Sequence, residues 1–408
     1  MTGGEIRMNI RKLIMVVVFC LLLAGGSLPT LLLPDKETSV AENRELQQRP
    51  KFTKKNFLKG KFQTQYDAYL NDQFFLRDDW VALAANMQIS LGQKDINGVY
   101  LGKDGYLLEK NDPTDFDKEQ VEENTEYLSK FLNDMTQAYG KEHVSCLMIP
   151  SKALALPDYL PDFAEIPRQD QVLNLLRSQL DDPGIMLDLC GEMQNHQKEY
   201  IYYRTDHHWT TLGAYYAYAA WAKMTGQITA DSLEHYERET VFTDFYGTTY
   251  NKVHAGSAAD SVEIFHSDGE KGVTVDMDDG EFTSDTMYFP EEAVEGFNRY
   301  NLFFSKNTFK IEVNTKAKTG KTLLLIKDSF ANCFVPFLTE DFDQIIMIDY
   351  RYGKMAMGRI LDEYKDITDV LVLFNTEKFM QNTKLERLSD TERKSSTMEE
   401  FNLEDFLE

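Results

Sequence analysis

The chain has 408 residues, of which 42% are hydrophobic and 12% aromatic. This composition is globular and excludes disorder over most of the length, which allows two or three domains or one large α/β domain with insertions. Lys and Arg number 43 against 67 Asp and Glu, so the formal charge is −24 at pH 7. Nucleic acid is therefore not an expected partner, because proteins that bind phosphate backbones concentrate Lys and Arg on one face.

Residues 13–33 form an uncharged, largely apolar run that follows three basic residues. A helix of this length crosses about 30 Å of hydrocarbon, and its basic flank predicts a cytoplasmic N-terminus. One interpretation is a cleaved signal peptide with its apolar core at 13–24, and the other is an uncleaved signal anchor at 1–34. We favour the anchor because apolar residues resume at 31–33 and no clean A-x-A site precedes Pro34. In both cases the rest of the chain is expected outside the cytoplasm.

Residues 35–96 begin as a polar linker and continue with aromatics and leucines at helical spacing, which predicts amphipathic helices. Residues 97–108 hold short β runs broken by glycines, as a hairpin requires, and a helix is expected at 119–139. The four cysteines do not suggest a disulfide framework, because one lies in the apolar run and the others are far apart in or beside apolar segments. We expect buried free thiols.

The rest of the chain predicts an open α/β sheet, because short apolar runs alternate with helical patterns. The runs are typical of parallel strands buried on both faces. The strands are predicted at 144–149, 185–189, 322–326, 345–348 and 370–374, and the helices at 171–180, 211–224 and 355–364.

Residues 230–310 break this alternation with aromatic-rich, acidic segments and many turn residues. We interpret them as an insertion beside the sheet, within a single α/β domain at 97–380. The remaining residues, 381–408, form a charged and weakly apolar tail to which we assign no function.

Two segments carry residues that could perform chemistry. In Asp206-His207-His208-Trp209, an Asp and a His two apart on extended backbone project to the same side, so Asp206 could orient the ring of His208. Ser329 follows the predicted strand at 322–326, and ligands of open α/β sheets bind beyond the carboxyl ends of their strands. Together these residues indicate a relay of nucleophile, histidine and acid.

Two other interpretations compete with this one. A Ser after a strand is most often a helix cap, and a His beside a Trp is often only packed in a core. A metal site is the chemical rival, with His254 or His266 added to the Asp and His residues of the signature. Adjacent histidines on extended backbone point to opposite faces, so we expect no metal there.

Several motifs, taken in order, resemble those of the DHHW proteins of Gram-positive bacteria, which are themselves similar to SGNH-hydrolase-like alginate O-acetyltransferase proteins. The motifs are Glu42-Asn-Arg-Glu-Leu with Pro50, Gly98-Val-Tyr-Leu-Gly-Lys-Asp-Gly, Asp206-His-His-Trp, Lys327-Asp-Ser-Phe with Pro336-Phe-Leu, and Ile348-Asp-Tyr-Arg-Tyr. The resemblance covers most of the chain and implies a flavodoxin-like parallel sheet in which the Asp-x-His element precedes the Ser.

The resemblance also implies that Ser329 is the nucleophile, His208 the general base and Asp206 its orienter. Phe330, Asn307 and Trp209 are candidate contacts to the substrate or its oxyanion, with the backbone N–H groups of Ser329 and Phe330 as the expected oxyanion donors. One stretch departs from the family, which usually has Gly-Gly-Asn where this chain has Phe304-Ser-Lys-Asn307. Because the two glycines are absent, we do not expect the backbone at 304–306 to approach a substrate closely.

The implied activity is acetyl transfer to a hydroxyl of a cell-envelope polysaccharide through an acyl-enzyme, without a cofactor. Acetyl-CoA is cytoplasmic, so the expected partner is a membrane-bound O-acyltransferase that hands acetyl groups across the membrane. One alternative is an acetyl esterase with the same three residues. Another is a non-catalytic scaffold or glycan-binding subunit of an acetylation complex. The sequence does not decide among them, nor does it identify the polysaccharide.

Overall fold

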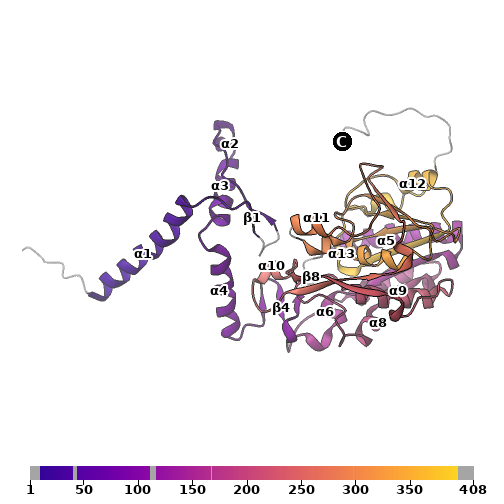
Figure 1. The fold of residues 1–408 in the computed structure, drawn as a ribbon, viewed down its shortest axis with the longest axis horizontal. Coiled ribbons are helices and arrows are strands. Elements are labelled where there is room, and N and C mark those ends of the chain that lie inside the picture. Colours follow the sequence, from indigo (N-terminus) through magenta and orange to yellow (C-terminus); the bar gives the residue numbers. More distant parts are fainter. Residues whose placement is uncertain (1–9, 40–43, 111–115, 167, 297, 394–408) are drawn as a thin grey trace, which may run out of the picture.

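An N-terminal helical arm projects from an α/β domain (Figure 1). The computed structural model describes residues 10–39, 44–110, 116–166, 168–296 and 298–393. Glu42 and Asn43 of the first motif therefore lie outside the described residues.

An eight-stranded mixed sheet forms the core of the described domain, in the order β11-β10-β12-β14-β13-β15-β6-β7. The last five strands in this order are parallel, and β12, β10 and β11 extend the sheet in antiparallel fashion. The bounds are β6 Val144–Ile149, β7 Met186–Asp188, β10 Thr274–Met277, β11 Phe282–Ser284, β12 Lys310–Asn314, β13 Thr322–Lys327, β14 Gln344–Ile348 and β15 Asp369–Asn375. All five strands predicted from apolar runs are present, and the predicted α/β class is confirmed.

Helices cover both faces of the sheet, because alternate strand residues point into two separate cores. Leu324 and Ile326 of β13 pack into one core and Leu323 and Leu325 into the other. The first core is covered by α5 (Lys118–Tyr139), α7 (Gln169–Gln179), α12 (Met357–Glu363) and α13 (Thr376–Gln381). The second is covered by α6 (Lys152–Ala155), α8 (Cys190–Asn195) and α9 (Thr211–Thr225). Cys146 and Cys333 are buried, and all four thiols are free.

We expected the segment 230–310 to lie beside the sheet, but part of it belongs to the sheet. Its strands β10 and β11 continue the main sheet through β12, and Val275 and Met277 of β10 join the same core. The segment also forms a separate ladder of β8 (Glu237–Phe245) and β9 (Asp260–His266), and the helices α10 (Tyr250–Val253) and α11 (Pro290–Glu295).

The beginning of the C-terminal tail packs against the α/β domain. A 3-10 helix at Leu385–Leu388 buries Leu385 and Leu388 in the core beneath α5, and Lys130 of α5 donates to the carbonyl oxygen of Ser389. The α/β domain therefore extends past residue 380. Residues 394–408 of the predicted tail lie outside the described residues.

The N-terminal arm begins with α1 (Ile10–Leu32), whose segment Lys12–Leu32 is long and apolar enough to cross a membrane. It continues through a short ladder of β1 (Thr38–Ser39) and β2 (Arg44–Glu45), then α2 (Lys54–Leu58), α3 (Lys61–Asp72) and α4 (Arg77–Ser90). The predicted hairpin is part of a three-stranded sheet of β3 (Asp95–Ile96), β4 (Val99–Leu101) and β5 (Leu107–Glu109). In Figure 1, α1 to α4 stand apart from the main sheet.

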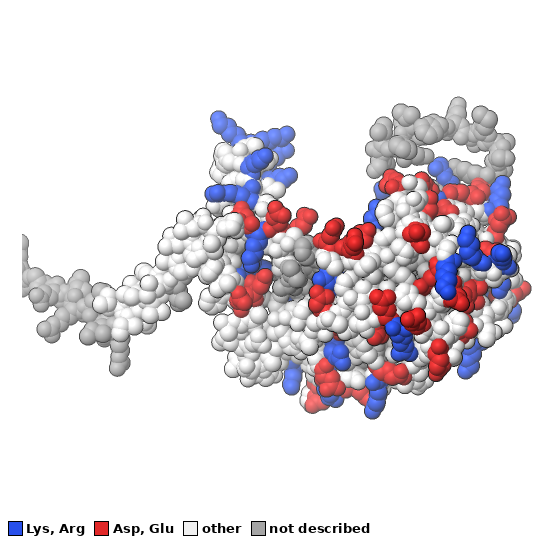
Figure 2. Space-filling view, viewed as in Figure 1, with Lys and Arg blue, Asp and Glu red and all other residues white. Residues whose placement is uncertain are grey.

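The end of the arm is positively charged, in contrast to the acidic chain as a whole. Figure 2 shows Lys and Arg atoms gathered over α2, whereas both signs are mixed over the α/β domain. The exposed lysines of this stretch are Lys51, Lys54, Lys55, Lys59 and Lys61. The net charge of −24 hides this local run of lysines, because it sums over the whole chain.

Candidate active site

Residues 203–208 form a loop whose backbone is tied down from two sides. Tyr202 and Trp209 pair as an antiparallel bridge at its base. The buried ammonium of Lys152 donates to the backbone oxygens of Tyr203 (3.0 Å), Arg204 (3.2 Å) and Asp206 (2.6 Å). A buried ammonium group is stable only when oxygen atoms accept hydrogen bonds from it. Here these three hydrogen bonds restrict the movement of the loop backbone. The loop that carries Asp206 and His208 is therefore held in one conformation.

Asp206, His208 and Ser329 form a continuous chain of hydrogen bonds. The Nδ1 atom of His208 lies 2.6 Å from Oδ1 of Asp206, and its Nε2 lies 2.8 Å from Oγ of Ser329. A carboxylate only accepts, so Nδ1 carries the proton and Nε2 can accept from the Ser329 hydroxyl. All three residues are less than a tenth exposed. This geometry can transfer the Ser329 proton to the imidazole.

Asp206 is fixed on its other side by Thr248, in the loop before α10. Its Oδ2 accepts from the backbone N–H (2.8 Å) and the hydroxyl (2.9 Å) of Thr248. Gly247 packs so closely that a Cβ there would lie 2.2 Å from the Asp206 Cβ. Burial raises the pKa of Asp206, but the neighbouring His207 and His208 outweigh this and hold it well below its usual value. The carboxylate is thus charged and oriented.

Ser329 is positioned by the residues around the end of β13. Oδ1 of Asp328 caps the following 3-10 helix, Ser329–Cys333, by accepting from the Phe330 N–H, and its Oδ2 accepts from the N–H of Asn375 at the end of β15. The Tyr300 hydroxyl donates to the Ser329 carbonyl oxygen (3.0 Å), and the Tyr300 ring stacks on His208 with centroids 3.8 Å apart. Tyr300 therefore holds both the serine backbone and the imidazole plane.

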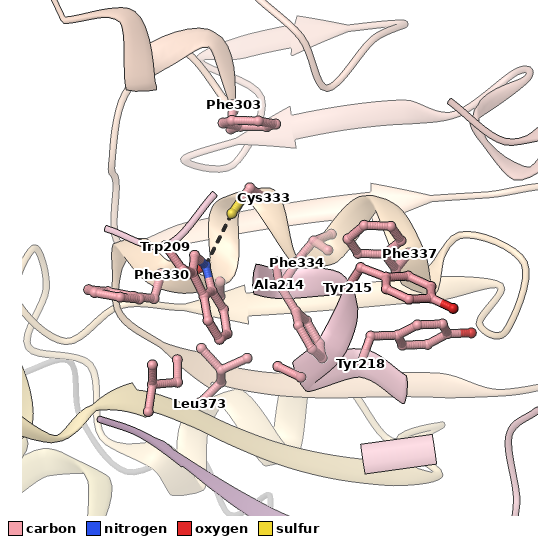
Figure 3. Packing of buried hydrophobic residues seen from close by; sticks show 14 of the residues in the cluster. Trp209, Ala214, Tyr215, Tyr218, Phe303, Phe330, Cys333, Phe334, Phe337 and Leu373 are labelled. Carbon is pink, nitrogen blue, oxygen red and sulfur yellow. Dashed lines mark hydrogen bonds between the residues drawn. The ribbon is translucent and has the colours of Figure 1, made fainter. Parts of the chain in front are cut away.

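Two expectations for substrate contacts are not met by this arrangement. The Phe330 N–H is 2.8 Å from the Asp328 carboxylate, so it is already used and does not face a substrate oxyanion. Trp209 is fully buried, and its indole N–H donates to the Phe330 carbonyl oxygen (3.0 Å). Figure 3 shows the indole in the core near Phe334 and Cys333. Trp209 therefore stabilises the 3-10 helix that begins at Ser329.

Comparison with known proteins identifies the family and the fold. The family model described as DHHW protein matches residues 111–348, more than half of the chain. The chain belongs to the DHHW family. A DHHW family protein from Eubacterium siraeum has a similar structure, with a TM-score of 0.59 and 25% identity over 72% of this chain and 95% of that one. The signature thus sits in the fold that the resemblance implied.

Two further proteins are also similar to this chain. PatB1 of Bacillus cereus, solved with a sulfonyl adduct, shares the fold, with a TM-score of 0.55 and 19% identity over 70% of this chain and 96% of that one. The probable alginate O-acetylase AlgJ of Pseudomonas putida is 26% identical over 170 residues, which are 41% of this chain and 44% of that protein. The chain thus matches less than half the length of this relative.

The departure from the family motif at 304–307 has a structural consequence. Phe304 and Ser305 adopt φ values of +61° and +56°, in the left-handed region that favours glycine. The backbone keeps a conformation suited to glycine although the glycines are absent. Asn307 then follows, and its Oδ1 accepts from Asn332 (3.1 Å) and Lys327 (3.4 Å). A lysine can only donate, so the Asn307 oxygen faces it and the Nδ2 group remains as a donor.

His207 lies differently from our expectation. We predicted that adjacent histidines would point to opposite faces, but residues 204–208 form bends, and the two imidazole centroids are 3.9 Å apart. One atom from each of Asp206, His207 and His208 lies within 4.8 Å of the others. The Nδ1 atoms of the histidines are hydrogen-bonded to Thr248 and Asp206, so the arrangement does not favour a metal ion.

Lys327 and Arg351 belong to a buried ion cluster beside the site. Arg351 makes a two-pronged contact with Asp349 (2.9 and 2.6 Å), as expected of a structural partner of an acid. Lys327 is not solvated, since it is 1% exposed and donates to Asn332 at 2.7 Å. Burial lowers the pKa of Lys327 to about 8.

The residues that the sequence analysis missed are those that hold the reactive groups: Lys152, Thr248, Asp260 and Tyr300. Asp260 is fully buried and accepts from the backbone N–H groups of Arg204 (2.9 Å) and Thr205 (2.7 Å). None lies in a recognisable motif of its own. Only Lys152 carried a local signal, because it follows the carboxyl end of a predicted strand.

Proposed function

We propose that this protein is an O-acetyltransferase that moves acetyl groups onto hydroxyls of a cell-envelope polysaccharide. The observation that carries the proposal is the position of His208, which bridges a buried carboxylate at 2.6 Å and a strand-end serine hydroxyl at 2.8 Å. Nucleophile, base and orienting acid in this order are the requirements for an acyl-enzyme mechanism.

In the proposed reaction, His208 takes the proton of Ser329 while the serine oxygen attacks the carbonyl carbon of an acetyl donor. The donor's leaving group receives that proton, and an acetyl ester remains on Ser329. A sugar hydroxyl then attacks this ester and gives its proton to His208, which returns it to Ser329. Asp206 stabilises the imidazolium in both steps, because its carboxylate accepts from Nδ1.

The developing oxyanion needs donors that are free to turn toward it. The Phe330 N–H is committed to Asp328, so the candidates are the backbone N–H of Ser329 and the Nδ2 group of Asn307. The Asn307 amide is oriented by Asn332 and Lys327, so little reorganisation is needed when charge develops. We assign one oxyanion contact to Asn307.

Relatives support the reaction class. The Pseudomonas putida protein is named a probable alginate O-acetylase, and we extend O-acetylation, though not the identity of the glycan, to this chain. The helix α1 would act as a signal anchor with a cytoplasmic N-terminus, or as a signal peptide if it is cleaved. The α/β domain then lies outside the cytoplasm, and acetyl groups reach it through a membrane-bound O-acyltransferase.

The first test uses the full chain purified in detergent with a chromogenic acetyl ester, alone and with neutral oligosaccharides. We expect release of the chromophore by the wild type and transfer of acetyl groups to sugar. The Ser329→Ala variant should lose at least about a thousandfold of this activity. Release without any acetylated sugar would favour the esterase, and equal rates in both proteins would contradict catalysis by Ser329.

A second test separates an enzyme from a scaffold in cells. Envelope acetylation is measured in a deletion strain that expresses the wild type, Ser329→Ala, or the arm without the α/β domain. An enzyme loses acetylation in both altered strains. Normal acetylation with Ser329→Ala, together with its loss when the domain is absent, would identify a non-catalytic subunit instead.

A further inference from the structure

A stripe of exposed apolar side chains runs along α4, the last helix of the N-terminal arm. Its members follow one another at intervals of three or four residues, so they share one face of the helix. They are Leu76, Trp80, Leu83, Met87 and Leu91. No charged residue occurs at 80–93. A contiguous exposed stripe of this kind is typical of a surface that contacts a partner or a membrane.

Another face of α4 packs against the α/β domain. Ala85 is buried in a small core that also contains Val253 of α10, and Ile89 packs against the same core. The helix α10 follows the loop in which Thr248 holds the Asp206 carboxylate. Among the described residues α4 is thus apolar on two sides and covered on one, and its covered side leads to the candidate active site.

The beginning of α4 is joined to the end of α1. The Phe75 N–H donates to the Thr30 hydroxyl (2.9 Å), which itself donates to the Gly26 carbonyl oxygen (2.7 Å). The Phe74 ring lies so close to Gly26 that an added Cβ would be 2.8 Å from it. Gly26 and Thr30 belong to the segment that can cross a membrane, and Gly26 lies about 9 Å before its last residue, Leu32. A bilayer that holds α1 therefore also meets the start of α4.

The direction of α4 keeps it near the side on which α1 lies. In Figure 1, α1 and α4 diverge from their junction and both run downward in the view, whereas α2 lies above the junction. The lysines gathered over α2 in Figure 2 are thus at the other end of the arm, and the stripe is an apolar surface. Trp80 suits a lipid contact, because Trp is enriched where membranes meet water. A second copy could cover the stripe, but it would not explain the junction with α1.

We propose that the stripe on α4 lies in the outer interface of the membrane that α1 spans, between the lipid headgroups and the first carbons of the acyl chains. The inference rests on the anchor in the proposed function, because α1 must cross the bilayer for α4 to meet it. The covered face of α4 then docks the α/β domain on the membrane. Ser329 is held in a fixed orientation to the bilayer, from which the proposed reaction receives its acetyl groups.

Trp80 provides the probe for this arrangement. The chain has three tryptophans, and Trp209 and Trp221 are 0% and 3% exposed, against 49% for Trp80. The full chain is placed in phosphatidylcholine vesicles whose acyl chains carry bromine, which quenches indole fluorescence on contact, near the headgroup or near the terminal methyl. The difference between the wild type and Trp80→Phe gives the Trp80 emission. We expect bromine near the headgroup to remove most of it, and bromine near the methyl to remove less.

A charge within the stripe should reverse this result. Leu83→Glu places a carboxylate one turn from Trp80, where lipid insertion would be costly, so the quenching should be lost and the emission should shift to longer wavelength. Leu83 is exposed, so the change removes no core contact. Asn86→Glu, at an exposed position of α4 outside the stripe, is the matched control and should keep the quenching. Equal quenching in Leu83→Glu and the wild type overturns the contact of the stripe with lipid.

A second indole tests the anchor separately. Phe19→Trp in the Trp80→Phe background places an indole within the apolar segment of α1, and bromine near the methyl should quench it strongly. Quenching there without quenching at Trp80 overturns the docking of α4. An unquenched Trp80 whose emission lies at short wavelength would mean that a second copy covers the stripe instead. No quenching at either position refutes the anchor of the proposed function, and the docking with it.

Discussion

The five parallel strands and the segment 230–310 contribute to the candidate site in different ways. The carboxyl ends of β13, β6 and β15 supply Ser329, Lys152 and Asn375. The segment supplies Thr248, Asp260 and Tyr300, which hold the Asp206 carboxylate, its loop backbone and the His208 ring. The strand ends thus present the nucleophile and part of its support, and the segment 230–310 orients Asp206 and His208.

The two regions differ because a serine and an imidazole need different amounts of restraint. A serine at the end of a parallel strand needs only the local turn that follows the strand. An imidazole that must meet a carboxylate and a hydroxyl within 3 Å needs restraint from several directions, which a single loop cannot provide. The contacts that provide it come from residues about 40 to 90 positions beyond His208, as Thr248 and Tyr300 show. Changes in the two regions should therefore have effects of different size.

The largest effect is expected within the hydrogen-bond chain itself. Asp206→Asn should lower kcat with the chromogenic ester by about 10³- to 10⁴-fold, because an amide can donate to Nδ1 and reverse the tautomer of His208. The exposed Asp170→Asn is the matched control and should be neutral. Steady-state kinetics and thermal melting separate lost chemistry from lost folding. A loss of less than tenfold would contradict the assigned role of Asp206.

An intermediate effect is expected from the segment 230–310. Thr248→Val removes the hydroxyl that links Asp206 to His207, and kcat should fall about tenfold, since one hydrogen bond to a charged group is lost while the backbone contact remains. Thr249→Val is the control, because the buried Thr249 hydroxyl has no hydrogen-bond partner among the described residues. If both variants have wild-type kcat, the segment does not orient the site.

Smaller effects, on stability alone, are expected at the amino-terminal ends of the parallel strands. Burial raises the pKa of Asp341, which precedes β14, to about 6. The folded state then binds more protons than the unfolded state between about pH 4 and pH 6, so this group lowers stability as the pH rises through that window. Asp341→Asn should add about 1 kcal/mol at pH 7.5 and nothing at pH 4, with unchanged kcat. Denaturant melts at both pH values test this, and a gain of equal size at pH 4 would refute it.

The smallest effect is expected at the left-handed backbone before Asn307. Ser305→Gly should raise stability by up to about 1 kcal/mol, because glycine adopts positive φ without the steric cost of a Cβ. Ser178→Gly, in the helix α7, is the control of opposite sign and should lose about 1 kcal/mol. Chemical denaturation distinguishes them. A loss of stability in Ser305→Gly would show that the conformation carries no strain.

The sequence predicted the parallel strands because their apolar residues are adjacent in the chain, as in Val144–Ile149. It also located Asp206, His208 and Ser329, since each lies in a short local pattern. It misplaced His207, because the rule of alternating sides applies to extended backbone and residues 204–208 are bent. It also assigned a free donor at Phe330, which Asp328 occupies. These contacts depend on distant segments, which local patterns do not reveal.

The most direct test of the account is the mass of the peptide that contains Ser329. The full chain is mixed with an acetyl ester, quenched in acid within seconds and digested, alongside Ser329→Ala and Ser151→Ala, which changes a buried serine just beyond β6. We predict an acetyl group on Ser329 in the wild type and in Ser151→Ala, and none at this position in Ser329→Ala. Turnover of the ester with no acetyl group on Ser329 at any time would contradict the acyl-enzyme.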